Sequence, residues 1–503
     1  MGIPSYYKRL VDTVKGLVSR KHPGKINTLW MDFNCLIYHC LRRPDMPAYK
    51  GNKDEWEEIF LNEIINYTKK VVGEVKPVDG VYIAIDGVVP MAKMRQQRMR
   101  RFKPKSFDTS KIEEVWDTNA ITPGTAFMEK LRYKLEVLCS LNKGWKVSSA
   151  DEPGEGEHKI MDQWRKINDI ESKVNAIYGL DADLIVLSLL NGNNPTWLFR
   201  EDIEMGEIKR DEMGEEQFTW FSIDALRDYI TSGSSCKKTF IRDYCFAMSF
   251  LGNDFLPSSL SYKMREDGHD RLLDLLNSSD HKQLIDDSGE INSDNLYFFI
   301  NKLALNEDKR LLVYINKKNR QANMIGTETG FGENNWPLSE RAENILVSGN
   351  TLKSDWQKIY LERFFGKGTL VEDICSTYLY GINWIWNYYM GKSVCYNWQN
   401  PWHLAPLWKW LAKSKMPELA GILALPGDIL PVEQLALVLP PHSWHLIRSA
   451  REKKLIELAP WLYPTYYTYN SIGKRFFWEC EAEIPIPSIL EVKSILDTSV
   501  KKS

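Results

Sequence analysis

The chain has 503 residues, of which 43% are hydrophobic and 26% are charged, and its formal net charge is −2. This length suffices for two to four domains or for one large composite core, and the 18 tryptophans exclude a disordered chain. The near-neutral charge argues against a protein that coats nucleic acid non-specifically, although a local basic site stays open.

The first half of the chain alternates short apolar segments, typical of strands, with helical patterns. The predicted strands are residues 27–32, 81–86, 145–149 and 174–181. The predicted helices include residues 55–72, 127–138, 223–230 and 241–251. Strands that alternate with helices in this way indicate an α/β fold with a parallel central sheet flanked by helices.

Acidic residues gather near the carboxyl ends of the predicted strands and in one glycine-rich turn. The seven candidates are Asp32, Asp86, Glu155, Glu157, Asp181, Asp183 and Asp254. Ligands of open α/β sheets bind beyond the carboxyl ends of the strands, where acids from several strands converge and repel one another unless a cation is present. A single aspartate of this kind is more often a cap or turn residue, but the motifs PGEGEHK (153–159) and GLDADL (179–184) together favour a metal site.

The chemistry of this set follows from its donor atoms. Carboxylate oxygens suit hard cations such as Mg²⁺ or Mn²⁺. Two such ions about 4 Å apart can stabilise both the attacking and the leaving oxygen during phosphodiester cleavage.

A basic segment begins seven residues after Asp86. Residues 93–105 read KMRQQRMRRFKPK, with seven Lys or Arg and no acid. At helical spacing Lys93, Gln97, Arg100 and Arg101 fall on neighbouring faces, where two guanidinium groups, an ammonium and an amide can bind a phosphate. On charge alone a solvated helix or a nuclear-import signal would be preferred, but the nearby acids favour a phosphate site.

Composition changes along the rest of the chain. Residues 317–335 read as an exposed loop or insertion, whereas 10 of the 18 tryptophans lie between residues 350 and 490. We predict a catalytic domain at 1–275, a variable linker or insertion at 276–350, a tryptophan-rich, mostly helical second region at 351–492 that packs on the first, and a tail at 493–503.

Several ordered motifs give the chain a family resemblance. They are MGIP (1–4), DFN (32–34), IDGVVPMAKM (85–94), NAITPGT (119–125), PGEGEHKIM (153–161), IYGLDADL (177–184) and GNDFLP (252–257). With these stretches the chain resembles the XRN family of 5′→3′ exoribonucleases over nearly all of residues 1–275. The match continues, less closely, through GINW (381–384), PWHLAP (401–406) and GKR (473–475), which resemble the second conserved region of the family.

The resemblance implies a fold, an activity and a site. The fold would be a PIN-like, 5′-nuclease-like domain whose active site is completed by the second region. The seven carboxylates would be the catalytic ligands of two Mg²⁺ ions, with Mn²⁺ as an alternative, and Lys93, Gln97, Arg100 and Arg101 would bind the 5′-monophosphate. The protein would be a monomer that degrades single-stranded RNA processively from its 5′ end and releases nucleoside 5′-monophosphates.

One position departs from the family pattern. The family places a base-stacking histidine six residues after the first strand-end aspartate, where this chain has Tyr38, followed by His39. A tyrosine can also stack on a base. We expect Tyr38 to act with a tryptophan of the second region, either Trp398 or Trp402, and prefer Trp398 from its place in the motif.

Two other functions stay open from the sequence. One is a structure-specific 5′ nuclease that cuts DNA flaps, and the other is an RNA-binding relative that has lost catalysis. The basic segment and the tryptophan-rich region argue against the first, and the presence of all seven carboxylates argues against the second.

The cysteines and the hydropathy pattern indicate in which cellular compartment the protein works. The eight cysteines are scattered and form no C-x-x-C pair, which argues against structural zinc and a disulfide framework. A reducing compartment follows, and we predict the cytoplasm, with the nucleus as the alternative. No apolar run is long enough to span a bilayer, so the sequence predicts no contact with a membrane.

Overall fold

The computed structural model describes most of the chain. The described residues are 2–103, 115–167, 173–192, 194–204, 207–232, 237–322, 338, 341–417 and 425–500.

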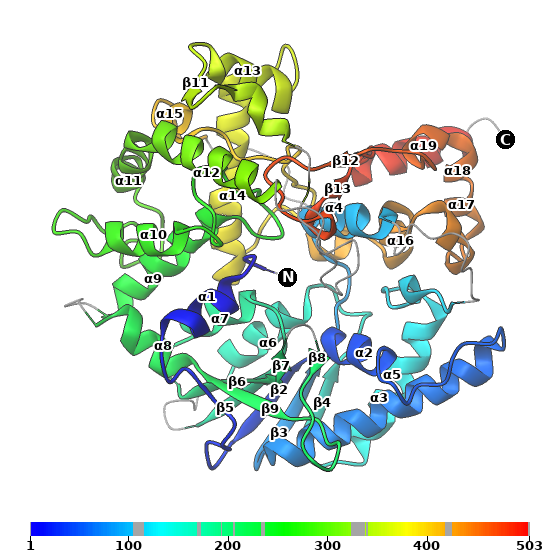
Figure 1. Ribbon diagram of the computed structural model, residues 1–503. Coiled ribbons are helices and arrows are strands. Elements are labelled where there is room, and N and C mark those ends of the chain that lie inside the picture. The colour runs from blue at the N-terminus through cyan, green and yellow to red at the C-terminus, as the bar shows by residue number, and fades with distance from the viewer. Residues whose placement is uncertain are drawn as a thin grey trace.

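A seven-stranded sheet organises the described part of the chain (Figure 1). Its strands, in spatial order, are β1 (Val18–Ser19), β9 (Phe218–Ser222), β6 (Thr196–Glu201), β5 (Asn175–Tyr178), β2 (Thr28–Asp32), β3 (Gly80–Ala84) and β4 (Trp145–Ser148). The five strands from β6 to β4 are parallel, whereas β9 runs antiparallel to both β6 and β1. The predicted parallel sheet is therefore confirmed, and an antiparallel edge is added to it.

The burial of the central strand shows that helices cover both faces of the sheet. Leu29, Trp30 and Met31 of β2 are all buried, as expected where helices cover both faces of a sheet. The helices of this half are α1 (Tyr6–Thr13), α2 (Asn34–Leu41), α3 (Lys53–Val75), α4 (Met91–Phe102), α5 (Ala126–Ser140), α6 (Gly156–Arg165), α7 (Asp183–Leu190), α8 (Ile223–Ile230) and α9 (Lys237–Met248).

The later part of the chain is mostly helical. Its helices are α10 (Gly268–Leu276), α11 (Ser293–Leu305), α12 (Glu307–Ala322), α13 (Trp356–Phe364), α14 (Val371–Tyr389), α15 (Trp408–Leu411), α16 (Pro431–Val438), α17 (Ala450–Lys453), α18 (Leu455–Leu458) and α19 (Ile489–Val500). Three short strand pairs accompany the helices and the sheet: β7 (Ile203–Glu204) with β8 (Glu207–Ile208), β10 (Val347–Ser348) with β11 (Thr351–Leu352), and β12 (Tyr469–Asn470) with β13 (Glu481–Ala482).

The helical part packs directly on the sheet domain. One hydrophobic core includes Leu29 of β2 together with Ile382 and Trp386 of α14, and a smaller core lies around Trp356 and Tyr360 of α13. In Figure 1 the long helix α14 descends from the upper lobe toward the sheet. Its carboxyl end is thereby brought to the edge of the sheet where the acidic residues lie.

The predicted domain boundaries stay a prediction. The range predicted as a linker, 276–350, contains α11 and α12, and the predicted tail contributes the second half of α19, in which Leu496 is buried.

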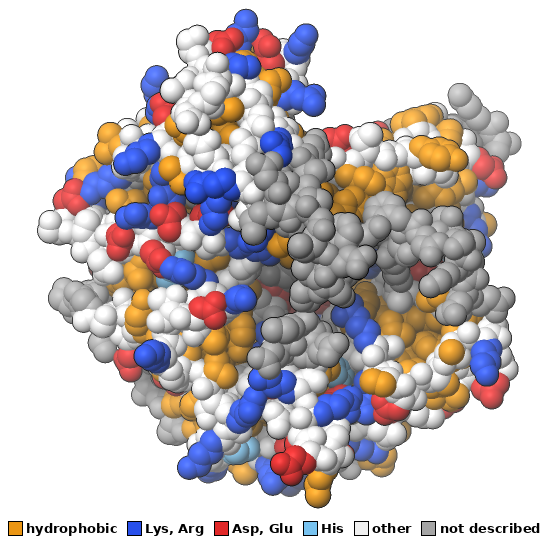
Figure 2. Space-filling view, viewed as in Figure 1, with side chains coloured by type: hydrophobic (Ala, Val, Ile, Leu, Met, Phe, Trp, Pro, Cys, Tyr) orange, Lys and Arg blue, Asp and Glu red, His pale blue; other side chains and the backbone are white. Residues whose placement is uncertain are grey.

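No helix within the described ranges combines the length and the apolar character that crossing a bilayer requires. Figure 2 shows that Lys and Arg side chains gather on the face over α10 and α12.

Candidate active site

The sheet topology brings three of the predicted carboxylates together. Asp32 is the last residue of β2, Asp86 follows β3 by two residues, and Asp181 follows β5 by three. Because β2 lies between β3 and β5, the three acids meet at one edge of the sheet. One oxygen each of Asp32, Asp86 and Glu157 lies within 4.8 Å of the others.

The start of α6 supplies two more carboxylates. Glu155 immediately precedes the helix and Glu157 lies in its first turn. The Gly156 amide donates a hydrogen bond of 2.7 Å to Oδ1 of Asp86. A Cβ atom at Gly156 would lie 2.8 Å from Oδ1 of Asp32, so only glycine lets α6 begin this close to the strand end.

The remaining acids close the other side of the cluster. Asp183 is the first residue of α7, and Asp254 follows the 3₁₀ turn Ser249–Leu251. The ammonium of Lys93 contacts Oε2 of Glu155 at 2.5 Å and Oδ2 of Asp254 at 2.8 Å, which ties these two acids together. A Cβ atom at Gly2 would lie 2.6 Å from Oδ1 of Asp183, so the start of the chain packs against the cluster as well.

This concentration of buried negative charge shifts the pKa values of several of these acids. Burial and the nearby charges of Asp86 and Asp181 raise the pKa of Asp32 well above its usual value. Burial and then the charge of Asp181 raise the pKa of Asp183 to about 8. Clustered carboxylate oxygens are the donor set that hard divalent cations prefer, so these residues fit a Mg²⁺ or Mn²⁺ site.

The raised pKa of Asp183 has a consequence for stability. Because the folded pKa, about 8, exceeds that of an unfolded aspartate, the folded protein holds the proton more tightly and loses stability as the pH rises toward 8. In EDTA we therefore expect the midpoint of thermal unfolding to fall between pH 6 and about pH 8. Saturating Mn²⁺ should reverse the trend, because metal binds the deprotonated acids. A midpoint that rises with pH in EDTA, or an Asp183→Asn variant with the same slope, would contradict this expectation.

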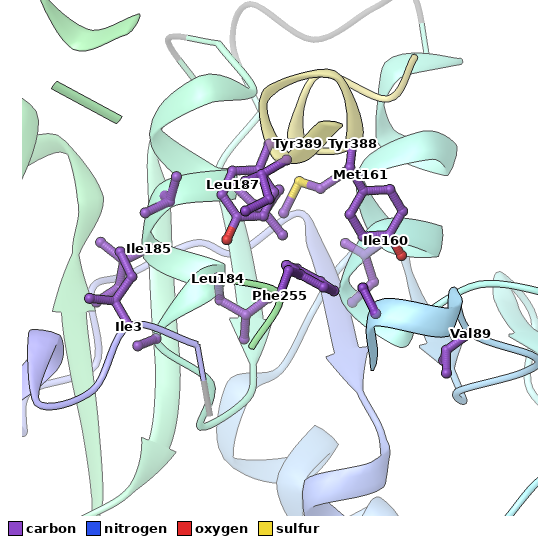
Figure 3. Packing of buried hydrophobic residues seen from close by; sticks show 14 of the residues in the cluster. Ile3, Val89, Ile160, Met161, Leu184, Ile185, Leu187, Phe255, Tyr388 and Tyr389 are labelled. Atoms are coloured by element: carbon purple, nitrogen blue, oxygen red, sulfur yellow. The ribbon is translucent and has the colours of Figure 1, made fainter. Parts of the chain in front are cut away.

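Two consecutive tyrosines at the end of α14 hold two of the clustered acids. The Tyr388 hydroxyl donates to Oε1 of Glu155 at 2.9 Å, and the Tyr389 hydroxyl donates to Oδ1 of Asp183 at 3.1 Å. Figure 3 shows both rings projecting from this helix end, Tyr389 on the side of Leu187 and Tyr388 on the side of Ile160. The ring of His158 stacks on Tyr388 with centroids 3.7 Å apart, which supports the ring from the α6 side.

The tyrosines were not among the predicted site residues. They follow the GINW motif, and the pair Tyr388–Tyr389 itself matched the second conserved region of the family in the sequence, without an assigned role. A hydroxyl hydrogen bond orients a carboxylate and so prepares it to bind an ion.

Removing one of these hydroxyls should weaken metal binding. We expect Tyr389→Phe to reduce Mn²⁺ affinity, measured by calorimetry, by about 10-fold, because Asp183 loses its orienting donor. Tyr378→Phe is the matched control, since the Tyr378 hydroxyl on the same helix is buried and makes no hydrogen bond within the described residues. Equal Mn²⁺ affinities for the two variants would rule out an orienting role.

Helix α4 carries the predicted phosphate-binding residues beside the acids. Gln97 is buried and accepts a hydrogen bond of 3.4 Å from Gln434 of α16. Burial lowers the pKa of Arg101 to about 10. Its Nη1 is buried and makes no hydrogen bond to any described residue. A guanidinium nitrogen in this condition is a ready donor for a phosphate oxygen.

The other basic residues of the segment differ in role. Arg100 is exposed, whereas Lys93 faces the acids rather than solvent. Arg98 is almost fully buried and donates to the carbonyl oxygens of Pro485 at 2.9 Å and Leu437 at 2.6 Å, so it attaches α4 to the second region. The predicted segment also included Lys105, which lies outside the described residues.

The proposed stacking pair is not in contact in this structure. Tyr38 lies on α2, beside Arg101. The Trp398 ring packs against Trp384 and Tyr380 of α14, with centroids 5.1 and 5.8 Å away. No ring contact joins Tyr38 to Trp398 among the described residues, and their role on RNA stays a prediction.

Two neighbouring aromatic residues have other partners: Trp402, the alternative to Trp398, and His39, which follows Tyr38. The His39 ring packs against Tyr67 in a tilted arrangement with centroids 4.4 Å apart, and Nε2 of His39 lies 3.4 Å from Oε2 of Glu216. Trp402 packs near Phe365 in the smaller core.

The fold and the acidic centre define a class: α/β proteins that collect carboxylates at the carboxyl edge of a parallel sheet to hold hard metal ions. Two family profiles narrow this class. The profile "XRN 5'-3' exonuclease N-terminus" matches residues 1–202, and "Xrn1 helical domain" matches residues 237–350. The chain belongs to the XRN family.

Named relatives agree with this assignment. The chain is 26% identical to 5'-3' exoribonuclease 2 of Gallus gallus across 97% of its own length and 66% of that relative. It is 26% identical to 5'-3' exoribonuclease 1 of Homo sapiens across 100% of its length and 34% of the relative. It is 31% identical to 5'-3' exoribonuclease 2 of Saccharomyces cerevisiae across 55% of its length and 35% of the relative. The matched region therefore spans between one third and two thirds of these longer proteins.

Proposed function

We propose that this protein is a metal-dependent 5′→3′ exoribonuclease that degrades single-stranded RNA carrying a 5′-monophosphate. It would act processively and release nucleoside 5′-monophosphates. The observation that carries the proposal is the meeting of carboxylates from β2, β3, β5, α6 and α7 directly beside α4, where Arg101 has an unsatisfied buried donor.

The chain's own residues suggest how the substrate is held. Arg101 and Gln97 would bind the terminal phosphate, with Arg100 at the exposed side of the same helix. The carboxylates Asp32, Asp86 and Glu157 would hold one divalent ion, and Glu155, Asp181, Asp183 and Asp254 would hold a second. Two Mg²⁺ ions, when bound there, would polarise the scissile phosphodiester and stabilise the attacking and leaving oxygens. Tyr388 and Tyr389 would keep two of these acids oriented toward the ions.

The direction of degradation would follow from the phosphate site. A site built for one terminal phosphate places the first phosphodiester of the RNA at the acidic centre. Repeated use of the same site would remove one nucleotide at a time from the 5′ end.

We propose that the protein works as a monomer, because the tryptophan-rich second region packs on the first and buries many of its aromatic side chains in the shared core. We also propose that it works in a reducing compartment, the cytoplasm or the nucleus, because its cysteines are scattered along the chain.

The test uses one 3′-labelled RNA with a 5′-monophosphate, a 5′-triphosphate or a 5′-hydroxyl, incubated with Mg²⁺ or with EDTA. We expect Mg²⁺-dependent loss of the monophosphate RNA without ladder intermediates, and much slower loss of the RNAs with the other two 5′ ends. Internal fragments that form regardless of the 5′ end would exclude the exonuclease, and preferred cleavage of a DNA flap would indicate a structure-specific nuclease. Binding without cleavage would indicate an inactive relative.

A further inference from the structure

The acidic centre contains a cation of its own. The Lys93 ammonium lies 2.5 Å from Oε2 of Glu155 and 2.8 Å from Oδ2 of Asp254. An ammonium this close to two carboxylate oxygens is their positively charged hydrogen-bond partner.

The acids of the centre fall into two groups, which differ in whether a positively charged side chain pairs with them. Among the described residues, no ammonium or guanidinium group pairs with Asp32, Asp86 or Glu157, the acids whose oxygens lie within 4.8 Å of one another. Glu155, in contrast, has one oxygen engaged by the Tyr388 hydroxyl and the other by Lys93. The ammonium and a divalent ion would therefore compete for Oε2 of Glu155 and Oδ2 of Asp254, because both cations are attracted to the same oxygens and repel each other.

The position of Lys93 on α4 indicates what could draw it away. Gln97 and Arg101 follow Lys93 by four and eight residues, so the three side chains lie along one side of the helix. A terminal phosphate held by Arg101 would attract the ammonium, whose flexible four-carbon stem allows it to turn. Once the ammonium has left Glu155 and Asp254, the oxygens of these acids would be accessible to a metal ion.

We propose that Lys93 is an internal cation that competes with the second divalent ion for Glu155 and Asp254, and that the 5′-phosphate of the substrate relieves this competition. The inference rests on the proposed function. It makes the complete metal centre depend on a correct 5′ end, because binding of the second ion and of the phosphate are linked, and such linkage is reciprocal.

The test measures Mn²⁺ binding to the RNA-free protein by electron paramagnetic resonance, without any activity readout. We expect the wild type to bind one ion tightly and a second at least about 10-fold more weakly, a coupling of ordinary size. Lys93→Met should tighten the second ion by about 10-fold or more. Lys93→Gln, which keeps a hydrogen-bond donor, should do the same and serves if the methionine variant does not fold.

Lys159→Met is the matched control for the loss of a buried positive charge. The Lys159 ammonium donates to the carbonyl oxygens of Ile85 at 2.8 Å and Ser149 at 2.7 Å, so its removal frees no carboxylate. We expect it to change the second ion's affinity much less than Lys93→Met does. Equal effects of the two substitutions would mean that only the overall charge matters, which overturns the proposal.

The phosphate arm uses adenosine 5′-monophosphate, with adenosine as its control. The monophosphate should tighten the second Mn²⁺ in the wild type but not in Lys93→Met, and adenosine should do neither. Two equal sites in the wild type, or no change in Lys93→Met, overturn the role of Lys93 while leaving the exoribonuclease intact if RNA is still degraded. No Mn²⁺ binding by any variant would overturn the metal centre of the proposed function and this inference with it.

Discussion

Asp32→Asn should strongly slow RNA degradation and at the same time make the metal-free protein more stable. Asp32 ends the central strand and shares the 4.8 Å cluster with Asp86 and Glu157. An amide is a far weaker ligand for a hard cation than a carboxylate. We expect the rate of Mg²⁺-dependent degradation to fall on the order of 1,000-fold, the scale on which a single transition-state-stabilising group acts.

The gain in stability has a separate cause. Asp32 is buried among like charges, and its raised pKa shows that its ionised form is disfavoured in the folded state. Removing that charge relieves repulsion, so in EDTA at pH 7.5 the midpoint of thermal unfolding should rise by a few degrees. Opposite changes in activity and stability at one residue are typical of a functional site.

The matched control is a buried aspartate elsewhere in the fold. Asp243 accepts hydrogen bonds from the amides of Leu284 at 3.0 Å and Ile285 at 2.8 Å and lies 2.8 Å from His281. Asp243→Asn should lower the unfolding midpoint and leave the rate per folded molecule unchanged. A loss of activity below about 10-fold in Asp32→Asn, with the control as expected, would show that Asp32 does not bind a catalytic ion.

Arg101→Ala should distinguish the phosphate site from general RNA binding. A charge-assisted hydrogen bond is worth about 1.5–3 kcal/mol, so we expect kcat/KM for 5′-monophosphate RNA to fall about 10- to 100-fold. RNA with a 5′-hydroxyl offers no phosphate to Arg101, and its slower degradation should change about 3-fold or less. The measurement compares the two substrates for wild type and variant.

Arg95 provides the control on the same helix. Arg95 lies six residues before Arg101 on α4, which packs against β13, and the negative charge of Glu481 in β13 partly offsets the burial that lowers the pKa of Arg95. Arg95→Ala should leave the ratio of the two substrates unchanged. Equal losses on both substrates in Arg101→Ala would instead assign Arg101 to the folding of α4 or to the RNA backbone at large.

Much of the fold could be predicted because many of its helices and strands follow from the pattern of neighbouring residues. The helix predicted at 223–230 is observed as α8 (Ile223–Ile230), and the predicted strand 27–32 is observed as β2 (Thr28–Asp32). Apolar periodicity and turn residues act over a few neighbours, so they are readable in the sequence. The strands β1, β6 and β9, which form one side of the sheet, lie outside the predicted ones, because strand pairing depends on residues far apart in the chain.

The basic segment shows that sequence patterns alone also cannot assign roles within the candidate site. Its charge and its helical spacing were apparent from the sequence, but charge does not distinguish a binding residue from a structural one. Arg98 is engaged with carbonyl oxygens of Leu437 and Pro485, more than 300 residues away, whereas Arg101 keeps a buried nitrogen without a described partner. Only the packing of α4 against α16 separates the two.

The sequence by itself therefore determined the alternating α/β order, the family, the set of acids and the basic helix beside them. Each of these is encoded in short motifs and their spacing. The tertiary structure alone decided which groups govern the acids: Tyr388 reaches Glu155 across 233 residues, Tyr389 reaches Asp183 across 206, and Lys93 reaches Asp254 across 161. Such contacts depend on how α14 and α4 pack on the edge of the sheet, and packing is a property of the whole buried core, not of any one segment.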